Sequence, residues 1–159
     1  MDEHVLKLIA HAAGGSEEAR KEGVVQLGLW IEDSARLGNE RQLDHVDEVI
    51  RELFLLLGRE RSGSVRGALL WAIGKGGRVT TVLGPLIDFA ADNPNIGSEE
   101  ARQWLVSLEN LLTSEGSVSA ELLRRAKAIC SSTPIFREPG ELIEIQARVM
   151  ANIDEALTE

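Results

Sequence analysis

The sequence has one cysteine, no tyrosine and few other aromatic residues, and these shortages exclude an internal disulfide and a core rich in aromatic side chains. Cys130 has no second cysteine in the chain to pair with, so an internal disulfide is excluded. Aromatic residues make up only 4% of the chain. The core must therefore consist of Leu, Ile, Val and Ala, which suits helices better than sheets, where aromatic and β-branched residues are favoured. From this composition we expect an all-α protein. Since the chain has no internal disulfide, we expect it in the reducing environment of the cytoplasm.

Long hydrophobic runs and an excess of positive charge are also missing. The longest apolar run, Leu53 to Leu57, is far shorter than the roughly 20 residues that cross a bilayer. No stretch has the basic and apolar regions of a signal peptide. A formal net charge of -9 repels nucleic acid and anionic lipid. We therefore expect no nucleic acid and no membrane among the partners.

The charge is unevenly distributed along the chain. Basic minus acidic residues give -6 for residues 1–50, +4 for 51–78 and -7 for 79–159. This basic centre between acidic flanks has two interpretations. It is either an ordinary mixture of solvated surface charges or a docking patch for an acidic partner or a second copy of the chain.

Apolar residues recur at helical spacing throughout one expected domain, residues 1–159. Helices are predicted at about 2–13, 16–37, 43–57, 62–76, 80–91, 98–113, 118–130 and 141–157. Ser16 is a predicted N-cap, and Gly38 and Gly58 are predicted stops. Pro85 leaves open whether the fifth helix begins near Thr80 or only near Gly84, since a helix-internal proline costs about 3 kcal/mol. Paired in order, these helices give hairpins at about 2–37, 43–77, 80–113 and 118–157.

A short sequence pattern recurs in three of these hairpins. The hexapeptide from Gly15 to Arg20 is repeated without change from Gly97 to Arg102, and Gly63-Ser64-Val65-Arg66 lies between them. The three arginines are 46 and 36 residues apart. The mean spacing falls within the roughly 40 to 47 residues of two-helix solenoid repeats.

The pattern resembles the second helix of HEAT repeats, in which Leu-Gly follows seven and eight positions after the arginine. Leu27-Gly28 follows Arg20 in this way, whereas the third copy has Glu109 at the leucine position. The resemblance implies a short right-handed α-solenoid of about four hairpins, whose second helices line a concave face. It also implies that the repeated arginines bond to neighbouring loops and carbonyls, and that the last hairpin is a cap with a polar outer face.

The candidate binding surface follows from the direction of Trp71. At 100° per residue, Arg66, Leu69, Leu70 and Ile73 cluster on one side of the fourth helix, and Trp71 points roughly 160° away from their centre. An exposed tryptophan near cations is a typical interface anchor, although packing between adjacent second helices could equally bury it. The residues predicted to bind a partner are Trp71, Lys75, Arg78 and Gly67 on this face, Val25, Leu29 and Ser107 at matching positions, and the nearby Arg59 and Arg61.

No residue pattern predicts catalysis, a metal site or a cofactor. The three histidines lack ligand spacing, and no histidine lies near Cys130 to activate it, so a buried thiol is expected. The stretch from Gly58 to Ser64 lacks the lysine of a phosphate loop. The carboxylates at 44, 47 and 48 are interpreted as a solvated face.

Three functions remain open. The first is a non-enzymatic protein-binding module, a scaffold or an inhibitor such as one that neutralises a toxin domain; for it, Trp71→Ala is expected to weaken binding with little effect on melting. The second is an accessory subunit of a lyase-type or other enzyme, which a ligand-sized pocket at His45 or Cys130 would favour. The third is self-assembly through the basic centre and acidic ends, which would be sensitive to salt.

Overall fold

The computed structural model describes residues 2–114 and 118–158, and within them the chain is all α-helical, with no strand. The all-α prediction is therefore confirmed. The elements are α1 (Glu3–Ala13), α2 (Glu17–Leu37), α3 (Glu40–Arg59), α4 (Gly63–Ile73), α5 (Val79–Asp92), α6 (Ser98–Leu112), α7 (Ala120–Ser132), the 3-10 helix η1 (Pro134–Arg137) and α8 (Glu141–Thr158).

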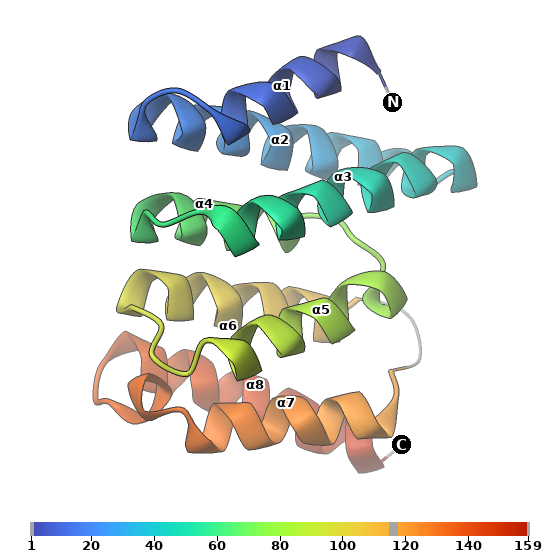
Figure 1. The fold of residues 1–159 in the computed structure, drawn as a ribbon. Helices are drawn as coiled ribbons and strands as arrows, with labels where there is room; N and C mark the ends of the chain where they lie inside the picture. Colours follow the sequence, from blue (N-terminus) through green and yellow to red (C-terminus); the bar gives the residue numbers. More distant parts are fainter. Residues whose placement is uncertain (1, 115–117, 159) are drawn as a thin grey trace.

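The helices form two layers, shown in Figure 1. One layer contains α1, α3, α5 and α7, and the other contains α2, α4, α6 and α8. Each helix of the first layer contacts the helix that follows it in sequence, and successive helices within each layer also contact one another. The two ends of the chain consequently lie at opposite ends of the stack. The aliphatic side chains between the layers form one connected core.

Capping residues set several of the helix ends. The Ser16 hydroxyl accepts a hydrogen bond from the Ala19 N–H at 3.1 Å, as predicted, and Gly38 ends α2 with a φ of 67°. The prediction for α3 was wrong at both ends. Asn39 caps its start three residues earlier than expected, and the helix continues through Gly58 to Arg59, since Leu57 is still packed in the core.

Pro85 lies inside α5, which begins at Val79 rather than near Gly84. The proline has no N–H to donate to the carbonyl of Thr81, one turn earlier. Thr81 and Pro85 are both exposed, so water can solvate that carbonyl. The opposite side of α5 buries four large aliphatic side chains, which offset the cost of the proline: Val82, Leu83, Leu86 and Ile87.

The three repeated arginines tie each hairpin to the next. Each lies near the start of a helix of the α2 layer and donates to a glutamate of the following hairpin. The pairs are Arg20 with Glu60 (2.9 Å), Arg66 with Glu100 (3.1 Å) and Arg102 with Glu141 (3.1 Å). Arg20 also donates to the carbonyl of Gly15, at 2.9 Å. Arg66 likewise donates to the carbonyl of Glu60, at 3.1 Å. The predicted bonding to neighbouring carbonyls therefore holds for Arg20 and Arg66, whereas the bond of Arg102 is to a glutamate side chain of α8.

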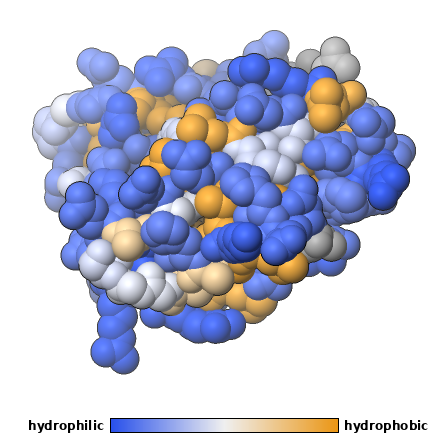
Figure 2. Space-filling view, turned by 90° about the horizontal axis from the view of Figure 1, so that it is seen from above, coloured by the Kyte–Doolittle hydropathy of each residue, from blue (hydrophilic) through white to orange (hydrophobic). Residues whose placement is uncertain are grey.

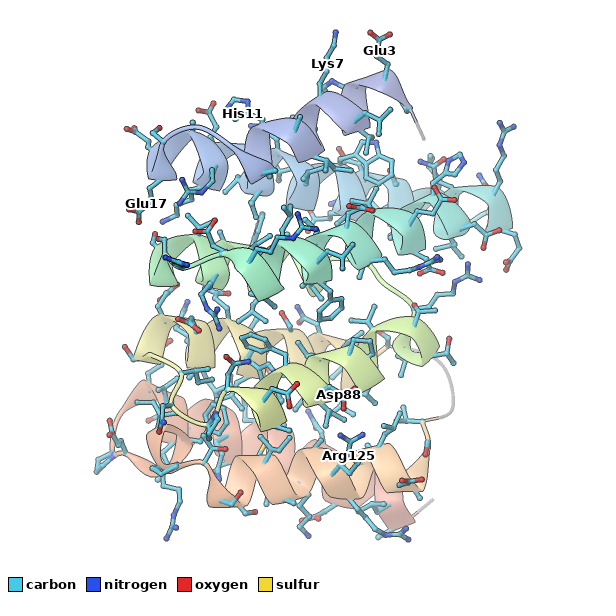
Figure 3. The ribbon with its side chains drawn as sticks, in the orientation of Figure 1. Glu3, Lys7, His11, Glu17, Asp88 and Arg125 are labelled. Carbon is cyan, nitrogen blue, oxygen red and sulfur yellow. The ribbon has the colours of Figure 1, made fainter. Side chains whose placement is uncertain are left out.

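The last hairpin is joined to the stack by aromatic and ionic contacts. Trp104 of α6 is fully buried, donates from its indole N–H to the Leu86 carbonyl at 2.8 Å, and stacks on Phe136 with 5.4 Å between ring centroids. Phe136 belongs to η1, inside the stretch predicted to be irregular. On the other layer, Arg125 of α7 pairs with Asp88 of α5 at 2.7 Å (Figure 3).

The outer surface is mostly hydrophilic. Seen from the α1 and α2 end of the stack, it shows hydrophobic patches separated by polar side chains (Figure 2). Among the described residues, no helix is both long enough and apolar enough to cross a membrane.

Candidate functional site

A shallow groove of about 190 Å³ crosses three neighbouring helices of the α2 layer. Its lining comes from α2, α4 and α6: Lys21, Val25, Ser64, Gly67, Ala68, Trp71, Glu99 and Gln103. Three of the predicted binding residues, Val25, Gly67 and Trp71, therefore lie together. Because Gly67 has no side chain, the floor of the groove stays open between α2 and α6.

Trp71 is half-buried, and its ring rests on Gly28 of α2. A methyl group at Gly28 would lie 2.3 Å from Cζ3 of the ring, so only glycine admits the ring at this distance. The Lys75 ammonium lies 4.6 Å from the centroid of the same ring and pairs with Glu32 at 3.4 Å. Trp71 therefore combines the two alternatives: its ring packs between second helices, and part of it still lines an open groove.

Polar side chains hold the two rims. On the α2 side, the Lys21 ammonium donates to the Ser64 hydroxyl at 2.9 Å. On the α6 side, the Gln103 amide donates to Glu99 at 3.0 Å. The groove thus has an apolar floor, a cation on one rim and a carboxylate on the other. This arrangement suits an extended peptide or a helix carrying both charges better than a purely acidic segment.

Sequence reasoning missed the rim residues, although a signal for them exists. Lys21 lies four residues before Val25, and Gln103 lies four residues before Ser107. Residues one helical turn apart share a face. Extending the predicted binding surface by one turn towards the N-termini of α2 and α6 would have included Lys21 and Gln103.

Ser107 and Leu29 were predicted for this surface but lie outside the groove. Ser107 is only 2% exposed, and its hydroxyl donates to the Leu70 carbonyl at 2.7 Å, where the absence of a side chain at Gly74 admits it. A partner cannot reach it in this structure, so including it was wrong. Leu29 is 43% exposed on α2 but does not line the groove.

Arg78 was also wrongly placed on the Trp71 face. The prediction continued the fourth helix to residue 76, but α4 ends at Ile73, so helical angles do not apply at residue 78. Arg78 instead precedes α5 and donates to Asp47 at 3.0 Å, to Glu40 at 3.1 Å and to Asp44. The hydrogen bond to Asp44 raises the pKa of the Arg78 guanidinium.

The acidic residues of α3 do not all belong to a solvated face. Asp47 is 6% exposed and accepts hydrogen bonds from Arg78 and from the Thr81 hydroxyl, the latter at 3.0 Å. The interpretation of this carboxylate as solvated was therefore wrong. Its partners are on the next hairpin, so Asp47 joins α3 to α5.

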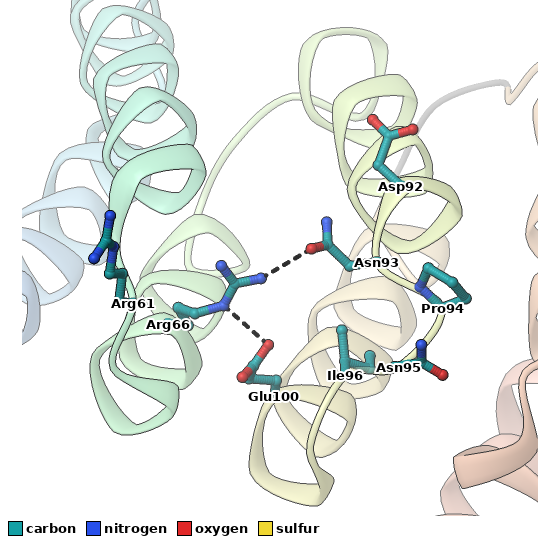
Figure 4. Close-up of a pocket in the computed structure, with 8 residues that line it drawn as sticks. All are labelled: Arg61, Arg66, Asp92, Asn93, Pro94, Asn95, Ile96 and Glu100. Atoms are coloured by element: carbon teal, nitrogen blue, oxygen red, sulfur yellow. Dashed lines mark hydrogen bonds and ion pairs between the residues drawn. The ribbon is translucent and has the colours of Figure 1, made fainter.

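Arg59 and Arg61 lie at the turn between α3 and α4, away from the Trp71 groove. Both line a cavity of about 300 Å³ next to Arg20 and Glu60. Arg61 also lines a polar cavity of about 420 Å³ beside the turn between α5 and α6 (Figure 4). There Arg66 bonds to Glu100 and to Asn93, the latter at 3.2 Å.

The chemistry of the remaining candidates is limited. Cys130 is fully buried, and burial raises the pKa of its thiol to about 12, so the nucleophilic thiolate is scarce at neutral pH. Among the described residues, no three His, Cys, Asp or Glu side chains are grouped to hold a metal ion. His45, with Trp30 and Arg41, lines a cavity of about 540 Å³ at the start of α3.

Comparison with known proteins finds no matching protein-family model, no matching curated protein and no matching solved structure. The resemblance to HEAT repeats stays a prediction that these comparisons do not test. Any function must therefore be argued from the residues and their contacts.

Proposed function

We propose that the chain is a non-enzymatic protein-binding module and that its arrangement is a short right-handed α-solenoid of the HEAT type. Two observations support the solenoid. Hairpins follow one another in sequence and in space, and the same arginine joins each hairpin to the next. In such arrays the exposed face of one helix layer is the usual binding surface.

The observation that carries the binding function is the groove across α2, α4 and α6, with half-buried Trp71 on its floor. A tryptophan that is held in place yet still accessible loses little entropy on binding, and such residues dominate interfaces. With only about 190 Å³ available, the groove fits one or two side chains of a partner rather than a cofactor.

Trp71→Ala alone cannot test this proposal. Because the ring packs on Gly28, its removal costs about 1–3 kcal/mol, less than the 3–5 kcal/mol of a fully buried aromatic residue. A loss of binding would then be mixed with a loss of stability. A variant that fills the groove without removing packing is needed.

Gly67→Gln fills the groove from its floor. The atom nearest to the new Cβ would be Cγ of the flexible Glu99 side chain, at 3.2 Å, and Gln103 Cγ and the Glu99 backbone would lie at an ordinary contact distance of 3.9 Å. Replacing a helical glycine gains roughly 0.5 to 1 kcal/mol of helix propensity. We expect this variant to melt near the wild-type temperature and to lose its partner. Affinity capture from the native organism with wild-type and Gly67→Gln baits, quantified by mass spectrometry, measures the loss.

Ala128→Gln, at an exposed position of α7, is the matched control. It should retain every protein that the wild-type bait retains. If Gly67→Gln, correctly folded by circular dichroism, captures the same proteins in the same amounts as the control, the groove is not the binding surface.

An accessory role in an enzyme is the second candidate, and the cavity at His45 favours it. The cavity of about 540 Å³ has a tryptophan ring, a guanidinium and an imidazole in its lining, together with the Asp2 carboxylate. These groups suit a planar polar ligand whose anionic group pairs with the guanidinium. A fragment screen by NMR distinguishes the candidates: aromatic carboxylates that shift the Trp30 indole and His45 resonances would favour the ligand-handling role.

A further inference from the structure

The α3 layer has a second groove, between α3 and α5, which is larger and more apolar than the one at Trp71. Its volume is about 530 Å³, and its lining comprises Asp47, Ile50, Arg51, Phe54, Leu55, Thr81 and Pro85. Two of the polar groups, Asp47 and Thr81, are already bonded to each other. Leu55 is 53% exposed at the rim. The groove therefore offers an incoming group mainly apolar contact, with one guanidinium beside it.

Free positive charge lies on α3, the helix that forms one side of this groove, and on the turn that follows it. The basic segment 51–78 contains six cations. Three of them form ion pairs with carboxylates of other helices: Arg66, Lys75 and Arg78. Arg51, Arg59 and Arg61 are exposed and form no ion pair within residues 2–114 and 118–158. A chain of net charge -9 thus presents three free guanidinium groups on the C-terminal half of α3 and the turn that follows it, while a fourth exposed arginine, Arg41, lies at the start of α3.

Helix geometry aligns these groups with the exposed leucine. Arg51, Leu55 and Arg59 are four residues apart, so they lie along one face of α3. At 1.5 Å per residue, the two arginines are roughly 12 Å apart along the helix axis. A partner helix with carboxylates seven or eight residues apart has the same spacing. Apolar residues between those carboxylates would face Leu55 and the groove.

We propose that this surface, formed by Arg51, Leu55, Arg59 and the groove between α3 and α5, binds an acidic amphipathic helix of another protein. Apolar anchors of that helix enter the groove, and its carboxylates pair with the arginines, as in helix-in-groove recognition. The apolar lining argues against a nucleic acid, which the net charge also repels. This surface is on the layer opposite the Trp71 groove. An experiment can therefore reject one of the two proposed binding surfaces without affecting the other.

A designed peptide tests the proposal. The probe is a helical peptide of about 16 residues, long enough to be partly helical in water, with glutamates spaced as above and leucines between them. A scrambled peptide of the same composition is its control. Added to the full-length, isotopically labelled chain, the probe should shift the NMR signals of Phe54, Leu55 and Thr81. It should bind at least roughly tenfold more tightly than the scrambled peptide.

Two double variants locate the binding energy. Arg51→Ala with Leu55→Ala should weaken binding of the probe roughly tenfold, which is the effect of losing about 1.4 kcal/mol. Arg41→Ala with Leu37→Ala removes an exposed arginine and an exposed leucine elsewhere, Leu37 being 67% exposed, and should leave binding unchanged. Melting curves of both variants verify that they are folded.

Three results would overturn the proposal. The first is equal binding of the designed and scrambled peptides, which would indicate unspecific charge attraction. The second is an equal loss of binding in the two double variants. The third is that unlabelled copies of the chain itself shift the same signals at lower concentration than the peptide, which would make this surface a contact between copies.

Discussion

Individual glycines determine how closely the helices of the α2 layer approach their neighbours. Gly23 lies against the backbone of Ala12, Gly28 against the Trp71 ring and Gly74 against Ser107. In each case an added methyl group would lie under 3.0 Å from an atom of the adjacent helix. Glycine at these positions contributes space rather than flexibility, since none of the three has a positive φ.

Two helical glycines provide opposite predictions. Gly28→Ala should destabilise the protein by about 1–3 kcal/mol, because the methyl group overlaps the Trp71 ring, which also contacts Lys75. Gly58→Ala should stabilise it by about 0.5–1 kcal/mol, since nothing lies within 4 Å of the new methyl group and alanine favours a helix. Urea unfolding at 25 °C measures both. Changes of the same sign would contradict the packing argument.

Sequence reasoning identified the direction of Trp71 but not the glycine that receives it. The helical angles of α4 separate Trp71 from Leu69 and Ile73, which are indeed fully or almost fully buried. Which residue of α2 lies under the ring depends on how far α2 and α4 are shifted along their axes relative to each other. The spacing of residues within a single helix does not reveal that shift. Nor does the sequence predict which contacts an identical residue of the repeated hexapeptide makes. Glu18 and Glu100 occupy the same position of it, yet Glu18 is exposed whereas Glu100 is buried and paired with Arg66.

At the scale of helices and hairpins, local chemistry predicted most boundaries and failed where glycines allow more than one conformation. The ends of α2 follow from Ser16 and Gly38, whose capping roles are local. Gly58 was predicted to end a helix that continues through it. The glycine pair at 76 and 77, expected near the end of a longer fourth helix, instead packs against α2, α3 and α5 after α4 has ended. Whether a helix continues through Gly58 or ends before Gly76 depends on contacts with other helices, which are far away in the sequence.

The ion pairs between hairpins make stability depend on pH in a defined direction. The hydrogen bond from Arg20 lowers the pKa of Glu60 in the folded protein. A lowered pKa means that the pair stabilises the fold above the ordinary glutamate value of about 4.3, and that this contribution is lost as pH falls through the lower folded value. The link between the first two hairpins should therefore weaken only in acid.

Glu60→Gln tests this link, because its amide oxygen can still accept from the N–H of Ser62, as Glu60 does at 3.1 Å. We expect the melting temperature to fall by roughly 2 to 4 °C at pH 7, the shift that about 1 kcal/mol produces in a chain of this size. The difference from wild type should shrink as the pH approaches 3. Glu18→Gln, at an exposed position of α2, should show no such difference. A difference for Glu60→Gln that is independent of pH would exclude a charge effect.

At the scale of the whole molecule, the structure redistributes the charge pattern seen in the sequence. Half of the cations of segment 51–78 are neutralised by acids from α2, α3 and α6. The basic centre is therefore not a continuous positive patch, and its free part is confined to Arg51, Arg59 and Arg61. For the acidic partner expected from the sequence, we therefore propose the surface of α3, on the layer opposite Trp71.

The same redistribution argues against self-assembly of the chain through its basic centre. Two copies each carry a net charge of -9, and repulsion between them grows as salt is lowered because the Debye length rises from about 10 Å at 0.1 M to about 30 Å at 0.01 M. The three free arginines of one copy offset only part of that repulsion. We expect light scattering to give the monomer mass of 17.3 kDa in both low and high salt. A mass that rises when salt is lowered would show that attraction between the basic surface and an acidic surface of another copy prevails.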